Sequence, residues 1–200
     1  MSILFVGGWA TEETQFPRLA SISRFLVPFN GFSSEELPAL VGGGGNILIG
    51  WSTGAHMLLK ECSHLFSSYD HVLLIAPFLS FIDSFPERLV RRMIAGMDKN
   101  PAEVVQSFHK NCAEEADLNF DPAQVPVLIE GLEYLIKSRV DVKPEIAADN
   151  LILIHADDDR IVRQKAFDQV LEKIPGAEVR LIDGGHKISE STLLNIIEGL

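Results

Sequence analysis

A serine between two glycines stands where a short apolar run gives way to an amphipathic segment. The residues Gly50 to Gly54 read G-W-S-T-G, with Ile47–Ile49 before them and the helix-compatible stretch Thr53–Phe66 after them. When a sharp turn joins a strand to a helix, its serine hydroxyl is exposed at the helix N-terminus, where partial positive charge favours a developing anion. The spacing therefore indicates that Ser52 is a nucleophile. The alternative is that Ser52 only caps the following helix.

A serine nucleophile needs a base that accepts its proton and an acid that orients the base. Of the six histidines, His186 is the best placed, because it lies in a glycine-rich loop directly after the apolar run Val179–Ile182. Three adjacent aspartates, Asp157–Asp159, follow the run Leu151–His155. Hydrophobic periodicity does not show which of the three orients the histidine. The two aspartates without this role would form the turn or cap the next helix. The candidate nucleophile, acid and base thus follow one another along the chain in the order Ser, Asp, His, each just after a predicted strand.

Two backbone amides are candidates for an oxyanion hole. Thr53 follows the nucleophile, and the segment Gly7, Gly8, Trp9 follows the first apolar run, Ile3–Val6. Glycines in such a loop let the backbone approach a ligand closely. We therefore expect the amides of Trp9 and Thr53 to bind the oxyanion, the alternative being a simple turn that ends the first strand.

The elements that must position these residues follow from hydrophobic patterning. Apolar runs too short for helices are typical of strands buried on both faces of a parallel sheet, and they occur at Ile3–Val6, Leu26–Pro28, Ile47–Ile49, Val72–Ala76, Leu151–His155 and Val179–Ile182. Helix-compatible stretches alternate with them, at Phe16–Phe25, Ser33–Val41, Thr53–Phe66, Gln164–Lys173 and Thr192–Glu198. The alternation predicts a three-layer α/β sandwich.

One long connection breaks this alternation. Residues 77–149 show no strand pattern, whereas Glu87–Met97, Ala102–Ala113 and Val125–Ser138 suit helices. Such a length is too great for a bare loop, and an insertion at the carboxyl edge of a parallel sheet would cover the crevice where ligands bind. We therefore expect a core of residues 1–76 and 150–200 and a helical lid of residues 77–149. The alternative is ordinary helices packed against one flank of the sheet.

Composition and net charge exclude several classes of function. The 200 residues include 46% hydrophobic ones, and 17 Lys and Arg against 28 Asp and Glu give a net charge of −11, which argues against nucleic acid and anionic lipid as partners. Cys62 and Cys112 are too few for a disulfide framework, so we expect both to be reduced.

No signal-like segment or spanning run of ~18 apolar residues is present, so we expect a cytoplasmic protein with no membrane contact. Metal-binding spacings such as H-E-x-x-H are missing, and we expect no metal or cofactor.

Together the motifs resemble the α/β-hydrolase family over nearly the whole chain. The G-G-W segment looks like the family's H-G-x oxyanion loop, with Gly7 in place of histidine. The residues Leu153–Val162 look like its acid strand and turn, I-H-G-x-x-D-x-x-V, with Ala156 in place of glycine. This alignment selects Asp159 as the acid, and His186 matches the family base. The resemblance implies a three-layer hydrolase fold of about six mostly parallel strands with a helical lid, and a Ser-Asp-His triad.

Within that family the chain is most similar to the pimeloyl-acyl-carrier-protein methyl ester esterases of biotin synthesis. Trp9 and Trp51 match their H-G-W and G-W-S segments, and Gly131–Leu135 with Val140–Val142 resembles G-L-x-x-L and D-L-R. The resemblance implies that Trp9, Trp51 and Phe108 contact the substrate. It also implies that the substrate is an acyl ester, either a small molecule or one carried on acyl carrier protein.

The chain departs from those esterases in two ways. Their additional leading hairpin is missing, so we expect a smaller sheet. Their arginines that dock acyl carrier protein precede the lid phenylalanine, and here the corresponding helix has Glu103, Gln106 and Ser107. Another basic face, spaced i, i+3, i+4, is formed by Arg88, Arg91 and Arg92. Its alternative is an ordinary solvated face that pairs with Glu87.

The sequence thus predicts a cofactor-free serine carboxylesterase that works through an acyl-enzyme. The narrower reading is removal of a methyl group from an acyl chain on acyl carrier protein. A general short-acyl esterase or thioesterase would use the same residues, and a hydrolase-fold binding module without turnover is the alternative of a different class. Acyl length, leaving group, oligomeric state and lid mobility stay open.

Overall fold

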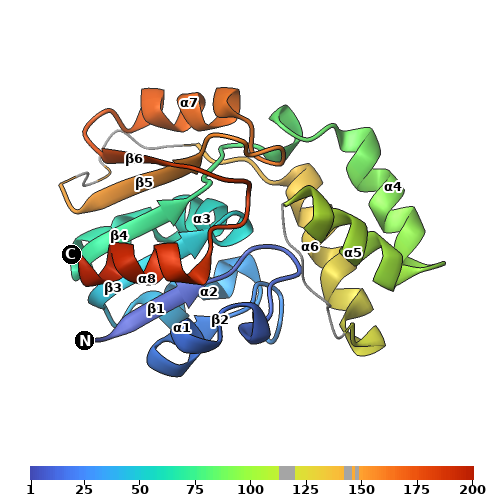
Figure 1. The fold of residues 1–200 in the computed structure, drawn as a ribbon, viewed down its shortest axis with the longest axis horizontal. Helices are drawn as coiled ribbons and strands as arrows, with labels where there is room; N and C mark the ends of the chain where they lie inside the picture. Colours follow the sequence, from blue (N-terminus) through green and yellow to red (C-terminus); the bar gives the residue numbers. More distant parts are fainter. Residues whose placement is uncertain (113–119, 142–145, 147–148) are drawn as a thin grey trace.

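The computed structural model describes residues 1–112, 120–141, 146 and 149–200. Six strands form one sheet in the order β2-β1-β3-β4-β5-β6 (Figure 1). Every neighbouring pair is parallel. The strands are β1 Ile3–Val6, β2 Arg24–Leu26, β3 Gly45–Trp51, β4 Tyr69–Ile75, β5 Leu151–Ala156 and β6 Glu178–Ile182. The prediction of a six-stranded parallel sheet is confirmed.

Helices cover both faces of the sheet, as Figure 1 shows. The helices on the faces are α1 Pro17–Ile22, α2 Leu37–Val41, α3 Thr53–Met57, α7 Gln164–Lys173 and α8 Glu190–Glu198. The helices between β4 and β5 are α4 Glu87–Met97, α5 Pro101–Asn111 and α6 Val125–Lys137. Short 3₁₀ segments occur at Glu13–Gln15, Ser34–Glu36, Ser63–Ser68, Phe81–Asp83 and Pro122–Gln124. Side chains of α1 and α8 share one core cluster, and those of α2, α3 and α7 share the other. The predicted three-layer α/β architecture is therefore confirmed.

The continuous apolar runs are explained by these two cores. Successive strand residues point to opposite faces of a sheet. Ile47 and Ile49 accordingly lie in the α1/α8 core, whereas Leu48, between them, lies in the opposite core. A central strand of a covered parallel sheet must therefore be apolar at every position, and this is the pattern that the sequence shows.

Near the edge of the sheet, the boundaries of α1 and β2 differ from the prediction. The helix expected over Phe16–Phe25 ends at Ile22, because Ser23 is extended, with φ −128° and ψ 160°. The edge strand then lies at Arg24–Leu26 rather than at Leu26–Pro28. Pro28 has no backbone N–H for a strand ladder, and the last residue of β2 that pairs with β1 is Leu26, opposite Val6.

The helix expected over Thr53–Phe66 is not continuous. It is α-helical to Met57, then forms a π-helical segment over Leu58–Cys62 before the 3₁₀ turns. Leu58, Leu59 and Cys62 of the π-helical segment all lie in one core cluster against the sheet.

Between β4 and β5, the described residues contain helices and no strand, as predicted. Helix α4 has the predicted bounds, whereas α5 and α6 differ slightly from them, and the predicted end at Ala113 lies outside the described residues. Side chains of α4, α5 and α6 form a third core cluster with residues that follow strand ends, among them Trp9, Ala76 and Ile161. These helices therefore lie at the carboxyl edge of the sheet, at the right of Figure 1. The domain limits 1–76, 77–149 and 150–200 stay a prediction.

None of the helices in the described part of the chain is long and apolar enough to span a bilayer. Cys62 and Cys112 are both buried, in two different core clusters. Burial raises the pKa of the Cys62 thiol to about 12.

Candidate active site

Ser52 forms a single-residue turn between β3 and α3. Its backbone has φ 54° and ψ −112°, a region that costs a non-glycine residue ~1–3 kcal/mol. The flanking positions have no room for a side chain. A Cβ on Gly50 would lie 2.8 Å from the Ala55 Cα, and a Cβ on Gly54 would lie 2.6 Å from the Gly7 carbonyl oxygen. The G-W-S-T-G motif is therefore a steric condition for this tight turn.

A chain of hydrogen bonds joins Ser52, His186 and Asp159. His186 Nε2 lies 2.9 Å from Ser52 Oγ, and His186 Nδ1 lies 2.8 Å from Asp159 Oδ2. The histidine and aspartate side chains are only 1% and 0% exposed. Since a carboxylate can only accept, the Nδ1 proton is donated to Asp159, and Nε2 of the neutral ring accepts from the Ser52 hydroxyl. This arrangement can remove a proton from Ser52.

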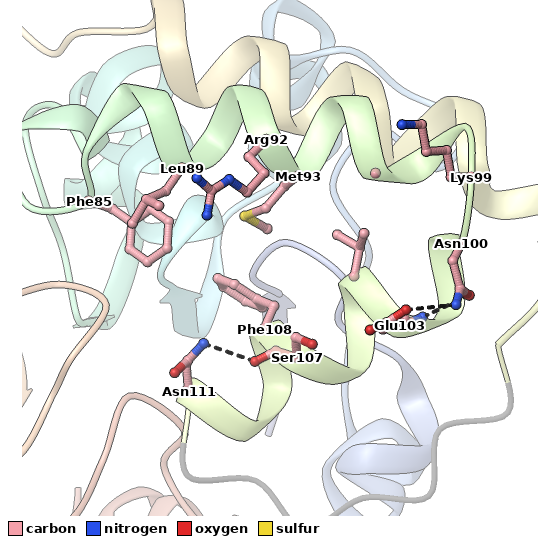
Figure 2. Close-up of a pocket in the computed structure, with 12 residues that line it drawn as sticks. Phe85, Leu89, Arg92, Met93, Lys99, Asn100, Glu103, Ser107, Phe108 and Asn111 are labelled. Atoms are coloured by element: carbon pink, nitrogen blue, oxygen red, sulfur yellow. Dashed lines mark hydrogen bonds between the residues drawn. The ribbon is translucent and has the colours of Figure 1, made fainter.

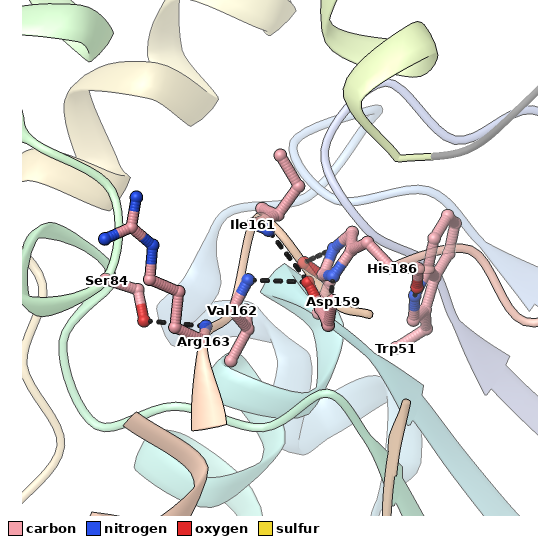
Figure 3. Close-up of polar contacts among 8 residues, drawn as sticks. Trp51, Ser84, Asp159, Ile161, Val162, Arg163 and His186 are labelled. Atoms are coloured by element: carbon pink, nitrogen blue, oxygen red, sulfur yellow. Dashed lines mark hydrogen bonds and ion pairs between the residues drawn. The ribbon is translucent and has the colours of Figure 1, made fainter. Parts of the chain in front are cut away.

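The turn after β5 holds Asp159 in place. Its second oxygen, Oδ1, accepts hydrogen bonds from the amides of Ile161 and Val162, each at 2.8 Å (Figure 3). The other two aspartates are exposed: Asp157 Oδ1 accepts from the Gly184 amide at 3.0 Å, and Asp158 pairs with Arg160 at 3.0 Å. The structure thus brings Asp159, the aspartate that the family alignment selects, to the histidine, and it leaves its neighbours in turn contacts.

His186 is anchored from two sides. The Trp51 indole N–H donates to the His186 carbonyl oxygen at 3.1 Å, and Figure 3 shows the indole beside the histidine. On the lid side, the Lys187 amide donates to the Cys112 carbonyl oxygen at 3.1 Å. These bonds connect the histidine loop both to the end of β3 and to the residue that follows α5.

Trp51 does not lie where the sequence predicts. Its side chain is 3% exposed and packs edge-on against Phe16, with ring centroids 5.6 Å apart, in the α1/α8 core. We therefore correct the expected substrate contact of Trp51 to a supporting position beneath His186. Strand parity was the signal that could have found this, because Trp51 shares its face with Ile47 and Ile49.

The candidate oxyanion amides lie beside the serine. A Cβ on Gly8 would lie 3.3 Å from Ser52 Cβ, so the loop after β1 runs close to the nucleophile. Thr53 is the first residue of α3, and the first amides of a helix have no partner within it. Among the described residues, neither the Trp9 amide nor the Thr53 amide donates to another backbone or side-chain group. Both are therefore available to an anion.

The lid covers Trp9. The indole N–H donates to the Leu128 carbonyl oxygen of α6 at 2.8 Å, and the Phe108 ring meets the indole edge-to-face, with centroids 4.8 Å apart. Gly131 leaves room for this contact, because a Cβ there would lie 2.8 Å from the indole Cδ1. Trp9 and Phe108, for both of which the family resemblance implies a substrate contact, are thus in direct contact with each other.

Helices α4 and α5 line an open cavity of about 530 Å³, whose lining residues Figure 2 shows. Its apolar lining includes Phe85, Leu89, Met93, Val104 and Phe108. The exposed cations Arg92 and Lys99 also line it. Ser52 and His186 are not part of this lining, so Phe108 is the residue shared by the cavity and the Trp9 contact.

The three candidate docking arginines are exposed on α4. Arg91 pairs with Glu87 at 2.6 Å, which is the solvated-face arrangement that the sequence analysis kept as the alternative. Arg92 faces the cavity between α4 and α5. Arg88 and Arg92 take no part in any ion pair among the described residues.

Two other buried histidines have packing roles. His56 Nδ1 lies 3.0 Å from the Phe78 carbonyl oxygen and Nε2 lies 2.8 Å from Ser138 Oγ, and burial lowers the pKa of His56 to about 4. His155 stacks on Phe167 at 4.6 Å, and burial lowers its pKa as well. Within the described ranges, no group of three or more His, Cys, Asp or Glu residues could hold a metal ion.

Comparison with known proteins gives the fold. No protein-family model matches the sequence, and no curated protein matches it. An esterase (EaEST) from Exiguobacterium antarcticum superposes with a TM-score of 0.73 at 15% identity, over 99% of this chain and 92% of that one. The esterase RhEst1 from Rhodococcus sp. ECU1013 gives 0.62 at 16% identity over 100% and 91%. The carboxylesterase CesB from Bacillus subtilis gives 0.61 at 16% identity over 99% and 81%. The chain therefore has the α/β-hydrolase fold.

Proposed function

We propose that the protein is a serine carboxylesterase that hydrolyses an acyl ester through an acyl-enzyme. The observation that carries the proposal is the buried hydrogen-bond chain from Ser52 through His186 to Asp159. Ser52 Oγ attacks the ester carbonyl carbon while His186 Nε2 takes the hydroxyl proton, and Asp159 stabilises the imidazolium. The proton then passes to the leaving alcohol, and water repeats the cycle on the acyl-enzyme.

The amides of Trp9 and Thr53 are the proposed oxyanion hole. The proposal is supported by the close approach of Gly8, which precedes Trp9, to Ser52 and by the position of Thr53 as the first residue of α3. Donors arranged before the reaction stabilise the developing charge without reorganisation, and loss of one such donor costs ~10²–10³ in kcat. No metal or cofactor takes part in this mechanism.

Replacement of Ser52 by alanine tests the reaction class. We expect Ser52→Ala to abolish hydrolysis of a short p-nitrophenyl ester and labelling by a fluorophosphonate probe. Ser67→Ala, on an exposed serine of the 3₁₀ segment before β4, is the matched control and should keep both. Full hydrolysis by Ser52→Ala would exclude the proposal, and a wild-type protein that neither labels nor hydrolyses would favour the binding-module alternative.

The narrower proposal is hydrolysis of a pimeloyl-acyl-carrier-protein methyl ester. It is supported by the resemblance at the two tryptophan segments and by the Trp9–Phe108 contact, which would line the acyl path. An acidic carrier would be repelled by a surface of net charge −11, so docking requires a local basic face. The proposed face is Arg88, Arg91 and Arg92 on α4.

Two measurements test the carrier proposal. The protein should restore growth without biotin to a strain that lacks its own pimeloyl esterase, and a well-expressed protein that fails would contradict it. Changing the three α4 arginines to glutamate should raise KM for the carrier-bound ester and leave small esters unaffected. The control carries the same charge change on core helices, at Arg18, Lys165 and Lys173. Equal effects of both triple variants would exclude a specific dock.

A general short-acyl esterase or thioesterase is the alternative within the same chemistry. The hydrogen-bond chain of Ser52 serves an ester or a thioester equally, so kcat/KM across acyl lengths and leaving groups distinguishes the two. A preference for short esters with no gain from the carrier would favour the general enzyme.

A further inference from the structure

The loop that follows β1 makes a tight turn directly beside the nucleophile. The Thr11 amide donates to the Gly8 carbonyl oxygen and closes a four-residue turn, but at 3.4 Å this bond is long. Ala10, inside the turn, has φ 58°, a conformation that L-residues rarely adopt. The backbone alone therefore holds this turn weakly, although the turn carries a candidate oxyanion amide.

A side chain supplies the missing constraint. The Thr11 hydroxyl donates to the same Gly8 carbonyl oxygen at 2.9 Å, a shorter contact than the backbone bond. Thr11 is 3% exposed, so water hardly competes for the carbonyl. Its rotamer is confined as well: a Cβ on Gly7 would lie 2.9 Å from both Thr11 Cβ and Cγ2, so the branched side chain packs tightly on the glycine backbone.

The geometry of the peptide group links this bond to the site. The Gly8 carbonyl and the Trp9 amide belong to one planar trans peptide, in which C=O and N–H point in opposite directions. A hydrogen bond that fixes the carbonyl therefore also fixes the direction of the Trp9 N–H. It polarises that N–H too, because hydrogen bonds in a chain strengthen one another. Gly8 itself lies against Ser52, at the 3.3 Å approach described above.

We propose that Thr11 is a positioning residue whose hydroxyl holds the Gly8–Trp9 peptide so that the Trp9 amide faces the oxyanion. This inference rests on the proposed esterase function and adds a residue that the sequence motifs do not mark. Thr11 touches neither substrate nor Ser52 in this role. It acts only through the peptide plane, and its effect should therefore appear in the transition state rather than in substrate binding.

The test compares Thr11→Val, which removes the hydroxyl at nearly constant shape, with Thr11→Ser, which keeps the hydroxyl and removes the methyl group. For a p-nitrophenyl ester, we expect Thr11→Val to lower kcat by about 10- to 100-fold with KM within about twofold of wild type, because a displaced oxyanion donor loses part of its ~10²–10³ contribution. Thr11→Ser should stay within about threefold of wild type. The pH profile of kcat/KM should keep its midpoint in both, since the His186–Asp159 contact is unchanged.

Each outcome decides the proposal. If the kcat of Thr11→Val is within twofold of the wild-type value, the proposal is wrong. It is also wrong if Thr11→Ser loses as much kcat as Thr11→Val, because the effect would then come from packing on Gly7. Circular dichroism and thermal melting report folding, and a Thr11→Val protein that does not fold beside a folded Thr11→Ser assigns the hydroxyl to stability and also overturns it. Failure of the esterase proposal is distinguishable, because wild type would then neither hydrolyse the ester nor label at Ser52.

Discussion

Replacing Asp159 by asparagine exchanges one carboxylate oxygen for an NH₂ group at a place where only donors converge. Three hydrogen-bond donors point at the carboxylate: the amides of Ile161 and Val162 on Oδ1 and His186 Nδ1 on Oδ2. Asparagine has a single acceptor oxygen. If that oxygen keeps the two backbone amides, the NH₂ group faces His186 Nδ1.

The imidazole then has to change tautomer. Nδ1 becomes the acceptor, the proton moves to Nε2, and Nε2 can no longer accept the proton of Ser52 Oγ, 2.9 Å away. A histidine held in the wrong tautomer costs ~10⁴ in kcat. The fold should be little affected, because each hydrogen bond at the aspartate keeps a partner, and we expect the free energy of unfolding to change by less than about 2 kcal/mol.

Steady-state hydrolysis of a p-nitrophenyl ester measures kcat, and urea denaturation measures the free energy of unfolding. Asp158→Asn is the matched control, because its exposed carboxylate pairs only with Arg160 in the described structure and its loss should leave kcat within about twofold. An Asp159→Asn enzyme that retains a tenth of wild-type kcat would refute the tautomer argument. So would an equal loss in Asp158→Asn.

Three further predictions follow from buried contacts. Gly54→Ala should lower the free energy of unfolding, measured by urea denaturation, by about 3 kcal/mol or more, because its Cβ would overlap the carbonyl oxygens of Val6 and Gly7. Gly43→Ala is the control and should leave the free energy of unfolding nearly unchanged, because a Cβ at Gly43 meets open space. Equal stabilities of the two variants would contradict the steric explanation. Trp51→Phe should lower kcat about tenfold at unchanged KM, because the His186 carbonyl loses its 3.1 Å indole donor; a raised KM alone would instead restore the substrate contact. His56 is buried neutral, and its pKa of about 4 lies below the ordinary 6.5, so the unfolded chain binds the extra proton first as the pH falls. In urea denaturation, the free energy of unfolding should therefore fall by up to ~3 kcal/mol as the pH is lowered from about 6.5 to about 4. The variant His56→Gln cannot titrate, so its free energy of unfolding should depend less on pH over this range. An unchanged pH dependence would exclude His56 as the cause.

Local features of the chain were sufficient for much of the fold. Ile3–Val6 and Leu151–Ile154 are apolar at every position, which is typical of strands covered on both faces. Helices α4 and α7 have the bounds that their patterning predicts. The G-W-S-T-G motif is likewise local in sequence, and Gly50 is required by Ala55 and Leu58 a few residues away, although Gly54 is required by the carbonyl oxygens of Val6 and Gly7 at the end of β1.

Contacts between distant segments decided the rest. Periodicity does not distinguish Asp157, Asp158 and Asp159, whereas the contact of Asp159 Oδ2 with His186 Nδ1, 27 residues further along the chain, does.

The two tryptophans show the same division. Both stand next to glycines in matching motifs, yet Trp9 lies under the lid while Trp51 lies in the core beneath His186, because a residue on a strand follows the face set by the sheet. The sequence by itself determined the α/β class, the strands and the serine turn, since those depend on short-range sterics and burial. The family alignment pointed to Asp159, but only the tertiary structure brought its carboxylate to His186 and decided that Trp9, and not Trp51, packs against α5 and α6. No motif marks the bond from the Thr11 hydroxyl to the Gly8 carbonyl oxygen, which became visible only in the folded loop. These contacts depend on how the backbone is placed in space, which local patterning does not encode.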